Sequence, residues 1–77
     1  AHLTIIPNPT VNEFSISLNT AVESASLEVY DITGKLISEA QFSNVDKVSS
    51  SISGQSGLYF VRLKTDHAEK WFKLMKH

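Results

Sequence analysis

The chain has 77 residues, a length that suits a single small domain. Its hydrophobic content of 42% favours a folded globular protein, and the absence of cysteine excludes a disulfide framework and a cysteine-bound zinc site. No apolar run approaches the ~20 residues that a membrane-spanning helix needs, and no signal-peptide pattern opens the chain. We therefore expect no membrane insertion. The chain is then either a cytoplasmic protein or a domain cut from a longer precursor, and the start at Ala1 favours the precursor.

The net charge of −1 is unevenly distributed. Residues 1–61 contain six acidic and two basic side chains, whereas residues 62–77 contain two acidic and five basic side chains. The C-terminal part of the domain is therefore basic, with a net charge of +3. This excess is weaker than the electrostatic footprint of a typical nucleic-acid-binding domain, so we expect no nucleic-acid partner.

Apolar and polar residues alternate through much of the chain, which is typical of strands with one buried face. The first candidate strand is LTII at residues 3–6. NEFSISL and ASLEVYD follow, and their alternation assigns to one face Phe14, Ile16, Leu18, Leu27 and Val29.

The segment DITGKL, at residues 31–36, separates two apolar runs and predicts a tight hairpin. The side chain of Asp31 can accept hydrogen bonds from its own backbone, and Gly34 can adopt the positive φ that a short loop with a bulge requires. The next candidate strand, residues 34–42, would carry on one face Leu36, Ser38, Ala40 and Phe42.

Two further candidate strands follow. DKVSSSIS is the weaker, with Val48 and Ile52 as its apolar residues, and the turn cluster SGQSG comes after it. GLYFVRLKT is the strongest in the chain. Its alternation assigns to one face Tyr59, Val61 and Leu63, and to the other Phe60, Arg62 and Lys64.

The last segment, KWFKLMKH at residues 70–77, can be interpreted as a strand that pairs back on GLYFVRLKT or as a short basic amphipathic helix. Eight residues make barely two helical turns, and an isolated helix of that length is unstable in water. The preceding turn favours the strand. As a strand, the segment is apolar on both faces, so an outward strip would contain Phe60, Arg62, Lys64, Trp71, Lys73 and Met75. This strip is either a binding face or a set of side chains half-covered by the twist of a small sheet.

These segments amount to about seven short strands with turn signals between them and no convincing helix. Regular short strands of this kind predict an all-β fold, a small antiparallel seven-stranded β-sandwich. Such a domain has short loops and little room for a deep pocket.

Patterns for catalysis and metal binding are weak. The histidines, at positions 2, 67 and 77, lack the short spacings of a metal site. Ser56 lies in Gly54-Gln55-Ser56-Gly57, which lacks the spacing and the following helix of a nucleophile elbow. The turns contain isolated acidic residues, Asp31, Asp46 and Asp66. We therefore expect no enzyme activity, no metal and no cofactor.

Four motifs occur in a recognisable order: PNPT at residues 7–10, VYDITGKLI at 29–37, SGLYFVRLKT at 56–65 and a Lys-Leu-x-Lys end at 73–76. In this order, and over essentially the whole chain, the sequence resembles the C-terminal sorting domain of the type IX secretion system of Bacteroidota, the secretion-tail family called type A. The resemblance implies a seven-stranded Ig-like β-sandwich. Residues 1–77 would be a single C-terminal sorting domain excised from a larger secreted protein.

Two sets of residues match the motifs of that family. The mainly structural set is Pro7, Asn8 and Pro9 in the opening turn, Gly34 and Lys35 in the hairpin, and Gly57 and Tyr59 at the start of a strand. The candidates for recognition by the secretion machinery lie in the terminal hairpin and are Lys70, Lys73, Leu74 and Lys76.

The resemblance also implies a function without catalysis. Such a domain would direct an N-terminal cargo domain of the same precursor through the periplasm and the outer-membrane translocon, to the cell surface or the extracellular space. A sortase-like peptidase would then cleave the domain off. The rival hypothesis is an Ig-like adhesion or carbohydrate-binding accessory module of a larger secreted enzyme, which would present an aromatic platform on one sheet face.

Overall fold

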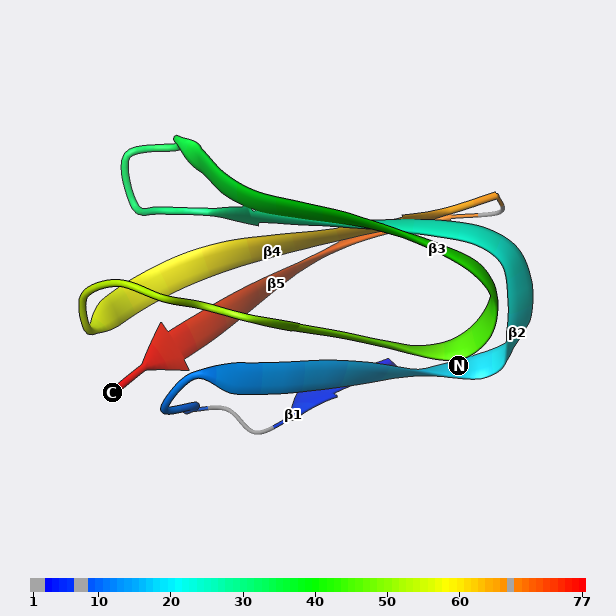
Figure 1. Cartoon of the computed structure of the whole chain (residues 1–77), viewed down its shortest axis with the longest axis horizontal. Coiled ribbons are helices and arrows are strands. Elements are labelled where there is room, and N and C mark those ends of the chain that lie inside the picture. Colours follow the sequence, from blue (N-terminus) through cyan, green and yellow to red (C-terminus); the bar gives the residue numbers. More distant parts are fainter. Residues whose placement is uncertain (1–2, 7–8, 67) are drawn as a thin grey trace.

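The structure, a computed structural model, describes residues 3–6, 9–66 and 68–77. These residues form five strands, which are labelled in Figure 1: β1 (Thr4–Ile6), β2 (Glu13–Tyr30), β3 (Leu36–Ser51), β4 (Gly57–Thr65) and β5 (Glu69–Lys76). The pairs β1–β2, β2–β3, β2–β4 and β4–β5 are all antiparallel. The predicted all-β, antiparallel fold is therefore confirmed.

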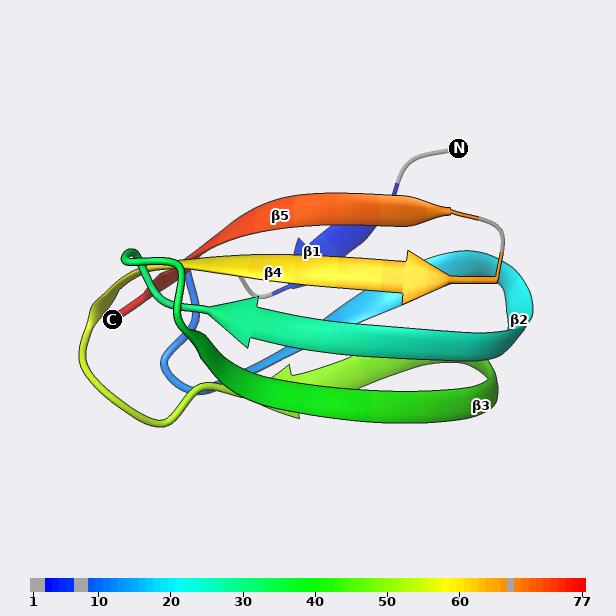
Figure 2. The ribbon, with the colours of Figure 1, turned by 90° about the horizontal axis from the view of Figure 1, so that it is seen from above.

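The sheet folds back on itself into two layers because its two longest strands bend together (Figure 1). The register between β2 and β3 is interrupted between Ser17 and Val22, where the bend lies. The lower layer in Figure 1 contains β1, the first part of β2 and the last part of β3. The upper layer contains the other parts of β2 and β3 together with β4 and β5, and Figure 2 shows these four strands side by side.

The described residues form five strands where the sequence predicts seven. The predicted strands at residues 12–18 and 25–31 correspond to the two halves of β2, and those at 34–42 and 46–53 correspond to the two halves of β3. The connecting segments NTAVES and SNVD contain neither glycine nor proline, so the backbone stays extended around the bend. Asn44 lies at the bend of β3 with a φ of 53°, a left-handed conformation that asparagine tolerates better than most residues.

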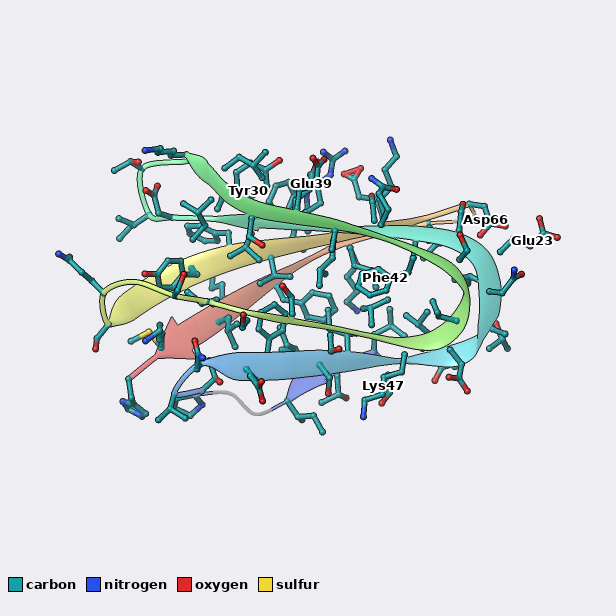
Figure 3. All side chains as sticks on the ribbon, in the orientation of Figure 1. Glu23, Tyr30, Glu39, Phe42, Lys47 and Asp66 are labelled. Carbon is teal, nitrogen blue, oxygen red and sulfur yellow. The ribbon has the colours of Figure 1, made fainter. Side chains whose placement is uncertain are left out.

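The core lies between the two layers, and its side chains are those that the alternation predicts to face inward. The largest fully buried side chains include Ile16 and Val48 from the lower layer, and Leu27, Val29, Val61, Leu63 and Leu74 from the upper layer. Figure 3 shows Phe42 pointing between the layers, whereas Tyr30 and Glu39 point away from the upper layer.

Leu36 is an exception to the predicted inward faces. The alternation predicts that it faces inward with Phe42, but its side chain is 44% exposed. A bulge shifts the register where Val29 and Tyr30 pair with the start of β3, and this shift turns Leu36 outward.

The hairpin between β2 and β3 is fixed by one carboxylate. Asp31 Oδ1 accepts hydrogen bonds from the Thr33 hydroxyl at 2.6 Å, the Thr33 N–H at 2.9 Å and the Lys35 N–H at 3.0 Å. These hydrogen bonds to the ionised form, that of the Thr33 side chain most of all, lower the pKa of Asp31. Gly34 has a φ of 89°, which confirms the positive φ predicted for it.

Tyr59 anchors the start of β4. Its ring is buried, and its hydroxyl donates a 2.6 Å hydrogen bond to the carbonyl of Gln55, four residues upstream. Gly57 has a φ of 146°, a conformation that residues with a side chain rarely adopt. Together these two residues determine how the chain enters β4.

Candidate interaction surface

β5 carries the C-terminal motif and presents different side chains on its two faces. In the register with β4, Trp71 lies opposite Arg62, and Lys73 lies opposite Phe60. These residues belong to the outer face of the upper layer, where Trp71 is 53% exposed and Met75 is 47% exposed. The prediction that aromatic and basic side chains form an outward strip is confirmed.

The four predicted recognition residues lie in different places. Leu74 is fully buried and belongs to the core, against which Phe72 also packs. Lys70 is exposed, with its Nζ 5.9 Å from the centroid of the Phe72 ring, and Lys76 is half-buried at the other end of β5. Lys73 is exposed on the outer face. The structure therefore does not gather these four side chains into one cluster.

Arg62 is the centre of a charged network on the outer face. Its guanidinium contacts both carboxylate oxygens of Glu69, at 3.0 and 3.2 Å, and Glu28 Oε1 at 3.1 Å. The same Glu28 oxygen accepts a 2.8 Å hydrogen bond from the Tyr30 hydroxyl. Arg62 Cζ lies 5.7 Å from the ring centroid of Trp71, and the Tyr30 ring lies 5.6 Å from that ring at an interplanar angle of 38°. The network joins β2, β4 and β5.

The pKa values of the network reflect these contacts. The hydrogen bonds from Arg62 lower the pKa of Glu69, because they stabilise the ionised carboxylate, and Glu69 in turn raises the pKa of Arg62. The hydrogen bond that Tyr30 donates to Glu28 raises the pKa of Tyr30, because it stabilises the protonated phenol. The ion pairs remain in contact with solvent, so the network orients these side chains more than it stabilises the fold.

Apolar side chains extend this outer face toward the β2–β3 hairpin. Tyr30 pairs with Leu36 on one side and with Phe60 on the other, and Phe60 pairs with Lys73, so one row of side chains crosses β3, β2, β4 and β5. We name this outer surface the aromatic face and define it by Tyr30, Phe60, Arg62, Trp71, Lys73 and Met75.

The end of β5 also contacts the segment that precedes β2. The Thr10 N–H donates a 2.8 Å hydrogen bond to the Met75 carbonyl, and the His77 N–H donates a 2.8 Å hydrogen bond to the Thr10 carbonyl. Thr10 lies beside Lys76 in an isolated parallel bridge. Two motifs at opposite ends of the sequence, PNPT and Lys-Leu-x-Lys, are therefore in direct contact.

Other motif residues lie at the same end of the molecule as this contact. Figure 1 shows that the β2–β3 hairpin, the β3–β4 connection and the end of β5 gather at one end of the molecule. Gly34 and Lys35 belong to the first of these segments, and Gly57 ends the second. Pro9 is exposed next to the buried Thr10. Outside the described residues lie Pro7 and Asn8.

Sequence reasoning missed two parts of this surface. The network of Glu28, Arg62 and Glu69 depends on the register between three strands, which local alternation does not encode. The turn at Thr10 could have been predicted locally, since a threonine in a turn readily forms hydrogen bonds with the neighbouring backbone. Its contact with β5 joins residues more than sixty positions apart, and local patterns carry no information about such a contact.

Two depressions lie elsewhere on the molecule. One, of about 900 Å³, is shallow and lies on the outer side of the lower layer, where serine side chains of β2 and β3 form much of its lining. The other, of about 310 Å³, has mostly apolar walls that include Leu3, Leu18, Val22 and Leu63.

In the described part of the chain, no group of three His, Cys, Asp or Glu side chains is arranged to hold a metal ion. The same part contains no helix that is long and apolar enough to cross a membrane.

The motifs and the sheet that brings their segments together point to one family. A family model described as the secretion system C-terminal sorting domain matches residues 4–77. The chain belongs to this family. Type IX sorting domains carry the signal that sends an attached N-terminal cargo toward the cell surface or the extracellular space, and the family is not known to be catalytic. A comparison with curated proteins gives no significant match.

Proposed function

We propose that this sorting domain is a non-catalytic signal that takes its cargo through the periplasm and the type IX outer-membrane translocon, after which a sortase-like peptidase removes it. The observation that carries the proposal is the family match, which covers residues 4–77 and therefore includes all four motifs. Residues 1–77 act in this account as one domain at the C-terminal end of a larger secreted protein.

The terminal strand is the best candidate for the part of the domain that the machinery recognises. It is basic, and it presents Lys70 and Lys73 to solvent, with Lys76 half-buried at its end. Leu74 contributes from within, because its burial holds the strand on the core while the lysines face a partner. The recognised feature is then the surface of a strand anchored in a folded sheet.

The direct test is the export of a reporter. Residues 1–77 are fused to the C-terminal end of a reporter enzyme that already reaches the periplasm. In a strain with a type IX system, the proposal predicts reporter activity at the cell surface or in the medium, and a product whose mass lacks the domain. In a matched strain without the translocon, the reporter stays in the periplasm. Periplasmic retention in the competent strain would contradict the proposal.

An Ig-like topology is a further part of this proposal. The hydrogen bond from the Tyr59 hydroxyl to the backbone four residues upstream resembles the tyrosine corner of Ig-like domains, which also lies near the start of a strand. The two-layered arrangement of the bent sheet supports the same classification. An experimental structure in which the Tyr59 hydroxyl lies away from Gln55 would contradict it.

The aromatic face supports a second candidate function, an Ig-like carbohydrate-binding or adhesion module of a larger secreted enzyme. Tyr30 and Trp71 lie within 5.6 Å of each other on a sheet face, with Arg62 and Glu69 beside them as hydrogen-bonding groups. A panel of soluble polysaccharides in affinity electrophoresis tests this function. Retardation of the domain that Trp71→Ala abolishes would support it, and unchanged mobility in every polysaccharide would contradict it.

A further inference from the structure

Among the described residues, Thr10 is the one buried side chain that is polar. It is 1% exposed, and its hydroxyl donates a hydrogen bond to the Glu13 carbonyl and accepts one of 3.2 Å from the Asn12 N–H. The Asn12 carbonyl in turn accepts a 2.8 Å hydrogen bond from the Ile52 N–H, just after the end of β3. The turn at residues 10–13 is therefore fixed both by its own side chain and by β3.

This turn determines what lies beside the end of β5. On one side, Lys76 pairs with Gly57 at the start of β4. On the other side, the backbone of Thr10 accepts a hydrogen bond from His77 and donates one to Met75. Strand ends with a neighbour on one side fray readily, whereas this end is held on both sides.

The Thr10 side chain controls that contact indirectly. Its hydroxyl does not touch β5, but its hydrogen bonds to Asn12 and Glu13 set the conformation of the turn. The turn conformation directs the backbone N–H and C=O of Thr10 at Met75 and His77. A side chain of the same shape without a hydroxyl removes the local bonds and leaves two backbone groups without a partner in a part-buried place.

We propose that Thr10 is a positioning residue for the sorting signal: it holds the end of β5 and the following His77 in place, so that the secretion machinery reads a folded surface built from both ends of the domain. This inference rests on the proposed function and deepens it. The terminal motif then acts as part of a composite surface, and a flexible peptide with the same terminal residues does not replace it.

Two substitutions and one matched control test the inference in the full chain. Thr10→Val has nearly the same shape but lacks the hydroxyl, whereas Thr10→Ser keeps the hydroxyl and should restore the bonds. The control is Val48→Ala or Val48→Gly, chosen to match the thermal stability of Thr10→Val, because Val48 is fully buried and its strand pairs with β2 and not with β5. Export of the reporter fusion and amide exchange of His77 are measured for each variant.

The inference predicts a specific pattern across these variants. In Thr10→Val, the His77 amide exchanges at least about tenfold faster, as expected when buried hydrogen-bonding groups lose their partners, and export falls clearly below that of the matched Val48 variant. Thr10→Ser restores both values. An exchange rate that rises while export stays equal to that of the control would overturn the inference, and so would an unchanged exchange rate.

This outcome is distinguishable from a failure of the proposed function. If the unmodified fusion does not leave the periplasm, the sorting proposal itself fails, whatever Thr10 does to amide exchange. If the unmodified fusion is exported and a flexible linker that ends in residues 69–77 exports the reporter equally well, sorting stands and the positioning role of Thr10 is wrong.

Discussion

The two outer surfaces of the folded sheet carry different kinds of side chain. On the lower layer, the register aligns Ser15 with Ser49 and Ser17 with Lys47, and short polar residues leave a shallow depression. On the upper layer, the aromatic face carries rings and long charged side chains, joined through Arg62 to two carboxylates. The lower surface carries small polar side chains that are common on solvated sheets, whereas the upper surface carries aromatic, methionine and arginine side chains, which are enriched at protein interfaces.

The difference shows how the same strands can serve two purposes. β2 and β3 contribute to both layers, and their bend places one half of each strand on each surface. β4 and β5 pair with the upper layer, so the basic C-terminal residues lie on the aromatic face or at its edge. The aromatic face therefore combines basic side chains with the carboxylates of Glu28 and Glu69.

The largest expected difference in stability is between substitutions on the inner side and on the outer side of β5. Leu74→Ala should lower the free energy of unfolding by about 2–5 kcal/mol, because it removes a fully buried side chain and leaves a cavity. Met75→Ala, the matched control on the outer face, should have a much smaller effect. Urea denaturation of both variants measures the difference. Equal losses would show that the two sides of β5 are not distinct.

The next prediction compares the loss of stability caused by one substitution on each outer surface. Trp71→Ala should lower the free energy of unfolding by about 0.5–1.5 kcal/mol, because it removes the aromatic contact with Tyr30. Ser49→Ala, on the lower surface, should change stability by less than about 0.5 kcal/mol. Thermal unfolding followed by circular dichroism compares them. If Ser49→Ala were the more damaging change, the assignment of an organised face to the upper layer would be wrong.

A pH titration tests how much two carboxylates of the upper layer, Asp31 in the β2–β3 hairpin and Glu69 on β5, contribute to stability. Asp31 and Glu69 have pKa values below their ordinary values of 3.8 and 4.5. Each carboxylate therefore contributes stability that is fully present above its ordinary value and is lost as the pH falls through the lower value of the folded state. Melting temperatures measured between about pH 2 and 6 should fall in that acidic window.

Asp31→Asn supplies the control for this titration. The amide cannot carry the charge that Thr33 and Lys35 stabilise, so the variant should be less stable than the native chain at neutral pH and should lose less stability on acidification. Parallel curves for the two proteins, separated by a constant offset down to the lowest pH, would show that Asp31 does not titrate as described.

The sequence predicts the inward faces well because alternation is a local property. Tyr59, Val61 and Leu63 are buried as the pattern of their own strand requires, and Asp31 and Gly34 form the predicted hairpin. The continuity of β2 and β3 is harder to predict from the sequence. The pattern of a bent strand with polar residues at the bend resembles that of two strands separated by a polar turn.

Contacts between distant segments are the part that the sequence does not reveal. Arg62 meets Glu28 because of the register between β2 and β4, and Thr10 meets β5 because the two layers approach each other at one end. The candidate recognition lysines differ in this respect, because the alternation along β5 already places Lys73 on the side opposite Leu74. Neither the register nor the closure of the layers is encoded in a short motif.

The central claim is that the machinery recognises the C-terminal strand, and its most direct test is a pair of charge reversals in the reporter fusion. Lys73→Glu changes the aromatic face, and Lys47→Glu makes the same change on the opposite side of the molecule, where Figure 3 shows Lys47 outside the lower layer. Both variants should fold. The account predicts that Lys73→Glu lowers export by about tenfold or more, because it reverses the charge of a candidate recognition lysine, while Lys47→Glu is exported normally. Equal export of the two variants would contradict the account.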